Sequence, residues 1–109
     1  MLTFDDAITI TNHPFYKQLF NKNNPNGAKI TGTFFISHEY SNYSLVNDLW
    51  IDGHDIALHS ITHVSNTQYW ARLDEEGWRK EIINQKEQLA TFSGVPTTDV
   101  LDHKLIEYC

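Results

Sequence analysis

The sequence has a single cysteine, Cys109, so no disulfide can form within the chain, and the cysteine count says nothing firm about its redox compartment. Long apolar runs are missing as well, because no stretch approaches the roughly 20 residues that cross a bilayer. The first residues lead directly into two aspartates instead of a basic and then an apolar stretch, so we expect no signal peptide in this chain.

Basic residues are also scarce. The sequence has 8 Lys and Arg against 14 Asp and Glu, which gives a net charge of -6. Such a surface repels a phosphate backbone, and no basic cluster offsets it. We therefore expect neither nucleic acid nor an anionic membrane as a partner.

The remaining composition is that of a globular protein, with 40% hydrophobic residues in a chain of 109. This length allows one domain at most. Short apolar runs alternate with segments of helical periodicity, and this order favours an α/β fold with a parallel sheet. The predicted strands are 1–4, 30–37 and 54–58, and the predicted helices are 14–20, 43–51 and 74–92.

Local signals mark the ends of the predicted helices. Either Ser41 or Asn42 can cap helix 43–51, and Gly94 stands where helix 74–92 must stop. The buried side of helix 74–92 is expected to carry Trp78, Ile82, Leu89 and Phe92. Strand 30–37 is apolar on both faces, as expected for a parallel strand covered on both sides.

Two short motifs follow predicted strands. Asp5 and Asp6 end the first strand, and His59 follows the third strand, with His63 four residues later. Ligand sites of parallel α/β folds gather at the carboxyl ends of the strands. We therefore expect both motifs at one edge of the sheet.

These residue types suit metal-assisted hydrolysis, because two imidazoles and one carboxylate leave coordination positions open. Zinc is the first choice, although the same ligands accept cobalt or iron. One helical turn after the strand would aim His59 and His63 the same way. Ser60 follows His59, so the zinc-protease pattern with its own glutamate base is absent, and Asp5 is the natural candidate for a base. An acidic pair alone more often caps a turn, so the prediction depends on the two motifs together.

Two sets of side chains receive a structural interpretation. Four histidines have no partner pattern and are expected on the surface or in loops: His13, His38, His54 and His103. Three tryptophans could stack on sugar rings, but their helical placement favours packing into the core: Trp50, Trp70 and Trp78.

Four stretches also carry a resemblance: 2–7 (LTFDDA), 24–27 (NPNG), 32–40 (GTFFISHEY) and 53–63 (GHDIALHSITH). They are similar to the polysaccharide deacetylases, the NodB-homology family or carbohydrate esterase family 4, and above all to the chitin deacetylases of invertebrates. The resemblance implies the N-terminal portion of a distorted (β/α) barrel. It also implies an extracellular protein.

The resemblance implies a role for each motif residue. Asp5 would be the general base, while Asp6, His59 and His63 would hold a metal, with zinc preferred and cobalt or another divalent metal as alternatives. The implied reaction is hydrolysis of a non-peptide amide bond. It would remove N-acetyl groups from chitin or another N-acetylglucosamine polysaccharide.

The sequence departs from the family pattern after Leu101. Residues 102–109 supply neither the expected Arg-x-Pro-aromatic motif nor the later histidine motif that would protonate the leaving amine, and Ala28-Lys29 stand where a family cysteine is usual. We therefore expect a partial deacetylase domain at 1–101 and a divergent tail at 102–109. A frame shift, a retained intron or an alternative exon would produce such a tail. A regular barrel takes about 250 residues, so we also expect an open sheet edge and self-association.

The sequence thus predicts a metal-dependent hydrolase acting on N-acetyl groups of chitin-like polysaccharides. The alternative is a truncated, catalytically inactive fragment that at most binds metal or glycan. A third hypothesis, a small self-standing metal-binding module, is weaker because nothing in the sequence closes the sheet.

Overall fold

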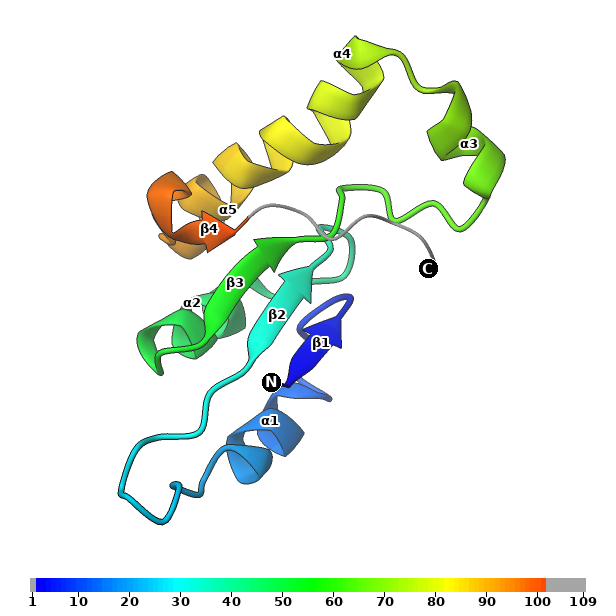
Figure 1. The fold of residues 1–109 in the computed structure, drawn as a ribbon. Helices are drawn as coiled ribbons and strands as arrows, with labels where there is room; N and C mark the ends of the chain where they lie inside the picture. Colours follow the sequence, from blue (N-terminus) through cyan, green and yellow to red (C-terminus); the bar gives the residue numbers. More distant parts are fainter. Residues whose placement is uncertain (1, 102–109) are drawn as a thin grey trace.

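A computed structural model describes residues 2–101 of the chain (Figure 1). Strands and helices alternate in order through most of the fold. The elements are β1 (Thr3–Asp5), α1 (His13–Leu19), β2 (Thr33–Ile36), α2 (Tyr43–Ile51), β3 (Asp55–Leu58), α3 (Thr67–Arg72), α4 (Glu75–Trp78), a π-helical segment (Arg79–Ile83), α5 (Asn84–Ser93), a short 3-10 turn (Thr97–Asp99) and β4 (Val100–Leu101).

The strands form one parallel sheet in the order β1-β2-β3-β4, so the predicted α/β class is confirmed. Strand β2 is shorter than the predicted 30–37, and β4 was not predicted. Strand β4 has only two residues and pairs with β3. A sequence pattern cannot distinguish so short a strand from a turn.

One face of the sheet carries the core. The side chains of Phe34 and Ile36 in β2 and of Ile56 and Leu58 in β3 are register partners and are buried in one hydrophobic cluster. Buried residues of α2 and of the long helix complete this cluster. In a strand, successive side chains point to opposite faces. The opposite face therefore carries the cross-strand row Asp5, Phe35, Ala57 and Leu101.

Helix α2 begins and ends where the sequence predicts. Of the two candidate caps, Asn42 is the one used, because its side-chain oxygen accepts a hydrogen bond from the Ser44 N–H at 3.1 Å. The chain leaves the helix through Gly53, whose φ of 95° favours glycine.

The predicted helix 74–92 is interrupted by the π-helical segment between α4 and α5. Asp74 caps its start, and Gly94, with a φ of 74°, ends it. Ile82 and Leu89 are buried as predicted, but Phe92 is 58% exposed, so that prediction is wrong. Ser93 takes the inward position instead, and the Phe92 ring packs on the flank against Tyr43 with centroids 5.5 Å apart.

The tryptophans pack within the protein. Trp70 of α3 is buried, and its indole N–H donates to the Val64 carbonyl at 2.7 Å. The rings of Trp70 and Trp78 lie 5.4 Å apart, and Trp50 packs against the core cluster. Trp70 lies in a helix as expected, although the bounds of α3 were not predicted.

The expectation that His54 lies at the surface is wrong, because it is only 4% exposed. Its Nδ1 atom accepts a hydrogen bond from the Gly32 N–H at 3.0 Å, and its ring lies 4.4 Å from the Phe20 ring. Burial, with a smaller contribution from Lys29, lowers the pKa of His54 below 6.5. His13 and His38 are half-buried, and His103 lies outside the described residues.

Within residues 2–101, no helix combines the length and the apolar character that crossing a membrane requires.

Candidate metal centre

Asp6 and His59 lie just beyond the carboxyl ends of two strands. Asp6 follows β1, and its N–H donates to the Phe35 carbonyl at 3.0 Å. His59 follows β3, where its N–H donates to the Ile36 carbonyl at 3.0 Å. Because β2 lies between them in a parallel register, both side chains reach the same edge of the sheet, as the sequence predicts.

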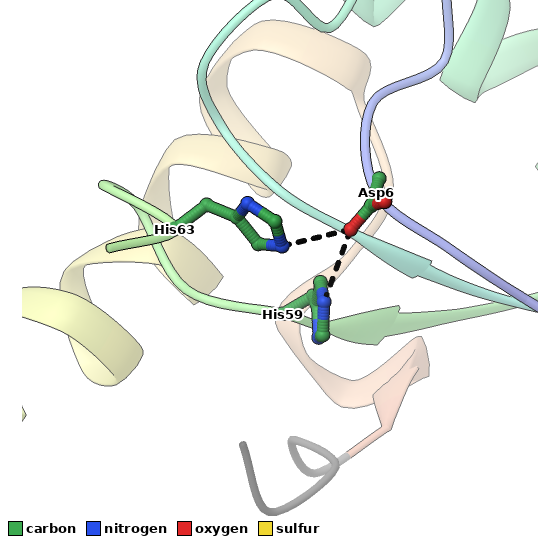
Figure 2. A group of neighbouring side chains, drawn as sticks. All are labelled: Asp6, His59 and His63. Carbon is green, nitrogen blue, oxygen red and sulfur yellow. Dashed lines mark ion pairs between the residues drawn. The ribbon is translucent and has the colours of Figure 1, made fainter. Parts of the chain in front are cut away.

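The three predicted metal ligands converge on one point (Figure 2). The Asp6 Oδ1 atom lies 3.2 Å from His59 Nε2 and 2.8 Å from His63 Nε2. One ligand atom from each residue lies within 4.8 Å of the other two. Among the described residues, this is the one group of three or more His, Cys, Asp or Glu side chains arranged to hold a metal ion.

His63 reaches this point from a loop and not from a helical turn, so the helical explanation for the His-x-x-x-His spacing is wrong. Ser60 and His63 both have positive φ angles, 77° and 50°, which an α-helix does not allow. The Ser60 hydroxyl accepts a hydrogen bond from the His63 N–H at 3.1 Å and closes the turn. The rings of His59 and His63 end 5.0 Å apart.

The donor set fits a divalent metal. Two atoms that bind the same zinc ion at about 2.0–2.1 Å stand about 3.3 Å apart in a tetrahedral site. The separations of Asp6 Oδ1 from the two imidazole nitrogens, 3.2 and 2.8 Å, are close to that value. His59 is 2% exposed and Asp6 is 61% exposed, so the group is anchored on one side and open to solvent on the other. This arrangement is that of a site with a free coordination position.

Asp5 does not belong to this group. It is the last residue of β1, half-buried, on the sheet face opposite Phe34 and Ile36. Asp6 lies beyond the strand with a φ of 81°, so the alternation of side chains along β1 does not extend to Asp6. The role of Asp5 as a base stays a prediction.

A depression of about 260 Å³ lies beside the metal group. Its lining includes Asp6 and His63 of the metal group and also Glu39 and Tyr40 from the loop after β2. Tyr40 is 88% exposed and has a φ of 66°. Both loop residues lie in the stretch 32–40 that carries the family resemblance, but the sequence alone predicted no role for either of them.

Backbone strain is concentrated at this edge of the sheet. The described residues include four non-glycine residues with positive φ, and all of them lie in the loops around the depression: Asp6, Tyr40, Ser60 and His63. Such conformations cost about 1–3 kcal/mol each and cluster at functional sites. Their clustering here indicates a site whose geometry the surrounding structure maintains.

Comparison with known proteins agrees with this geometry. A family model described as polysaccharide deacetylase matches residues 1–101, and the chain belongs to this family. Two relatives from Bombyx mori, Chitin deacetylase 1 and Chitin deacetylase 8, are each 40% identical to it, over 102 and 100 residues. These matches cover 92% and 91% of this chain, but only 19% and 26% of the relatives.

A solved structure shows the same fold. The crystal structure of a peptidoglycan N-acetylglucosamine deacetylase, in complex with 4-naphthalen-1-yl-N-oxidanyl-benzamide, aligns with a TM-score of 0.63 at 26% identity. The alignment covers 85% of this chain and 40% of that chain. The chain therefore has the fold of part of such an enzyme and spans about a fifth to a quarter of the two curated relatives. The predicted division at residue 101 stays a prediction, since residues 102–109 lie outside the described part.

Proposed function

We propose that this chain is the metal-binding part of a hydrolase that removes N-acetyl groups from chitin or a similar N-acetylglucosamine polysaccharide outside the cell. The observation that carries the proposal is the convergence of Asp6 Oδ1 with the Nε2 atoms of His59 and His63. The names of the relatives, two chitin deacetylases and a peptidoglycan N-acetylglucosamine deacetylase, support the substrate class.

Asp6, His59 and His63 would hold the metal, with zinc as the first candidate and cobalt as an alternative. A divalent metal held there would lower the pKa of a water and polarise a carbonyl oxygen. The buried His59 fixes the position of the group, and the exposed Asp6 leaves it accessible from the depression.

Asp5 would accept the proton of the attacking water. Asp5 ends β1 and directly precedes Asp6 in the sequence. Its carboxylate is not part of the metal group. A base in this place can act on a water without competing for the metal. Tyr40, exposed beside the depression, would offer a flat ring to a sugar unit.

A second candidate function is supported by the lengths of the matches. The chain corresponds to 40% of the solved relative and to smaller shares of the curated ones. A chain that supplies the metal ligands without the rest of the site would bind metal or glycan and release no acetate.

Two measurements on the purified chain separate these candidates: zinc binding by calorimetry and acetate release from N-acetylglucosamine oligomers. Under the first proposal, Asp5→Asn keeps zinc affinity within about threefold and lowers acetate release by about 10²–10⁴-fold, because a general base contributes about that much. Asp6→Asn loses both zinc binding and release.

Zinc binding by the parent chain without acetate release would establish the second candidate. Absence of zinc binding in a folded parent chain would overturn the metal site itself. A matched control is Asp55→Asn, because Asp55 is an exposed aspartate at the opposite end of β3.

A further inference from the structure

The loop that carries His63 needs support from outside itself. Residues Ile61 to Val64 have no regular secondary structure, and Ser60 and His63 at its two turns hold positive φ angles. His59 is different, because the ladder between β2 and β3 fixes its backbone. The position of His63 against Asp6 therefore depends on whatever holds this loop.

Glu81 is the side chain that holds it. Its Oε2 atom accepts hydrogen bonds from the N–H groups of Ile61 and Thr62, both at 3.1 Å. Its Oε1 atom accepts hydrogen bonds from the hydroxyls of Thr62 and Tyr69, both at 2.7 Å. These four bonds use the full accepting capacity of one ionised carboxylate.

The burial of Glu81 is unusual for a glutamate on a helix. It is 4% exposed, and within residues 2–101 no lysine or arginine forms an ion pair with it. A buried charge without a counterion is costly unless hydrogen bonds satisfy it. Three of the four donors belong to Ile61 and Thr62, in the loop between the two histidines, and the fourth is the Tyr69 hydroxyl of α3. The bond to Glu81 also raises the pKa of the Tyr69 hydroxyl, which keeps it a donor.

Gln85 joins the loop to the sheet. Its Oε1 atom accepts a hydrogen bond from the Ser60 N–H at 2.8 Å, and its Nε2 donates to the Ile36 carbonyl at 2.5 Å. Gln85 is completely buried and follows Glu81 by four residues. The π-helical segment 79–83, which contains Glu81, is the irregularity that precedes Gln85, and such segments are frequent at functional sites.

We propose that Glu81 is a positioning residue that holds the Ile61–Thr62 backbone so that the His63 imidazole faces Asp6. This inference rests on the proposed metal site. The proposal predicts that the two histidines respond differently to a change at Glu81. His63 should move, whereas His59 should stay in place because the sheet positions it.

Zinc affinity measured by calorimetry tests the proposal. Glu81→Ala is expected to lower zinc affinity by about 10–100-fold, the usual effect of removing a group that orients a metal ligand. Glu81→Gln keeps the volume and one accepting oxygen and should fall between Glu81→Ala and the parent chain. The control Glu87→Gln changes an exposed glutamate of the same long helix and should bind zinc as the parent does.

A double-mutant cycle excludes a general effect on folding. In a His63→Ala background, Glu81→Ala should lower zinc affinity by less than about twofold, because residues that act through one another are not additive. An equal loss in both backgrounds would overturn the proposal, and so would full affinity in Glu81→Ala. If Glu81→Ala fails to fold, Glu81→Gln carries the same comparison.

NMR of the metal-free chain provides a readout that does not depend on zinc. Glu81→Ala should shift the His63 ring signals and speed hydrogen exchange at the Ile61 and Thr62 amides, while the His59 ring signals stay unchanged. Unchanged His63 signals, or equal shifts of both histidines, would overturn the proposal. If the parent chain binds no zinc, the metal site fails, and this measurement still decides whether Glu81 positions His63.

Discussion

At the residue scale, the site consists of ordinary side chains on an unusual backbone. Asp6 and His63 both have a positive φ, which is uncommon for residues other than glycine, although Asp and His adopt it more often than most. Hydrogen bonds from neighbouring segments stabilise these conformations, as for Asp6, whose N–H donates to β2. A single substitution in these supporting contacts can therefore change the site without touching a ligand.

His54 gives a prediction about pH at the same scale. Its pKa is lowered in the folded chain, mainly by burial, so the unfolded chain takes up the proton first as the pH falls below 6.5. The free energy of unfolding should therefore be fully retained above pH 6.5 and should decrease as the pH falls below it. The decrease amounts to about 1.4 kcal/mol for each pH unit that separates the two pKa values.

Urea unfolding at pH 5, 6 and 7, with a chelator present, measures this effect. The parent chain should lose more stability between pH 7 and 5 than His54→Asn, whose amide oxygen can still accept the Gly32 N–H. Parallel pH curves for the two chains would show that His54 does not titrate as burial requires.

At the element scale, the long helix 74–93 combines two functions. Its buried side packs Ile82 and Leu89 into the core, and Glu81 and Gln85 face the loops at the edge of the sheet. The π-helical segment contains one residue of each kind, Glu81 and Ile82. A regular helix through the same residues would present a different set of side chains to the loop, because each π turn takes up an extra residue.

The end of this helix provides a prediction about its stability. Gly94 has a φ of 74°, and a Cβ atom added there would meet the Asn47 Nδ2 atom at an ordinary 3.5 Å. The cost of Gly94→Ala is therefore backbone strain alone, about 1–2 kcal/mol of unfolding free energy. Gly94→Asn should cost less, because asparagine adopts this conformation more easily.

Denaturant unfolding of the two variants beside the parent chain tests this rank order. If Gly94→Ala stays within about 0.5 kcal/mol of the parent, the left-handed end of the helix is not the state in solution.

At the scale of the whole molecule, the chain is more extended than its length predicts. Its Cα radius of gyration is 14.5 Å, whereas about 13 Å is typical of a compact domain of 100 residues. Its extents are 47 × 27 × 25 Å, and Figure 1 shows α3 and α4 reaching away from the sheet. Helices α1, α2 and α5 pack on one face of the sheet, and the row with Phe35 and Leu101 lies on the other.

This architecture predicts self-association. Within residues 2–101, strands β1 and β4 are the outer strands of the sheet, and β4 carries Leu101, which is 46% exposed. Exposed strand edges with apolar side chains pair with other chains, and a lysine placed there opposes such pairing. Light scattering after size exclusion should show a mass that rises with concentration, and Leu101→Lys should reduce this rise.

Thr91→Lys, which adds the same charge to an exposed position of α5, is the matched control and should behave as the parent does. A parent chain that stays monomeric over the whole concentration range would contradict the prediction.

The sequence determined the class of the fold and the edge of the sheet at which the candidate metal-binding residues lie. Apolar runs and helical periodicity are local signals, so the parallel sheet and helix α2 could be predicted from them. The rule that ligand sites lie at the carboxyl ends of parallel strands then placed Asp6 and His59 together. The first prediction depends on the local sequence alone, and the second depends also on a general property of parallel sheets.

Only the tertiary structure decided how the site is held. The loop conformation of His63, the burial of His54 and the role of Glu81 depend on contacts between segments distant in the sequence. A glutamate among the charged residues of a helix looks like a solvated side chain until the opposite loop is known. The physical reason is that a buried charge is stabilised by the particular donors around it, and here those donors come from residues 61, 62 and 69.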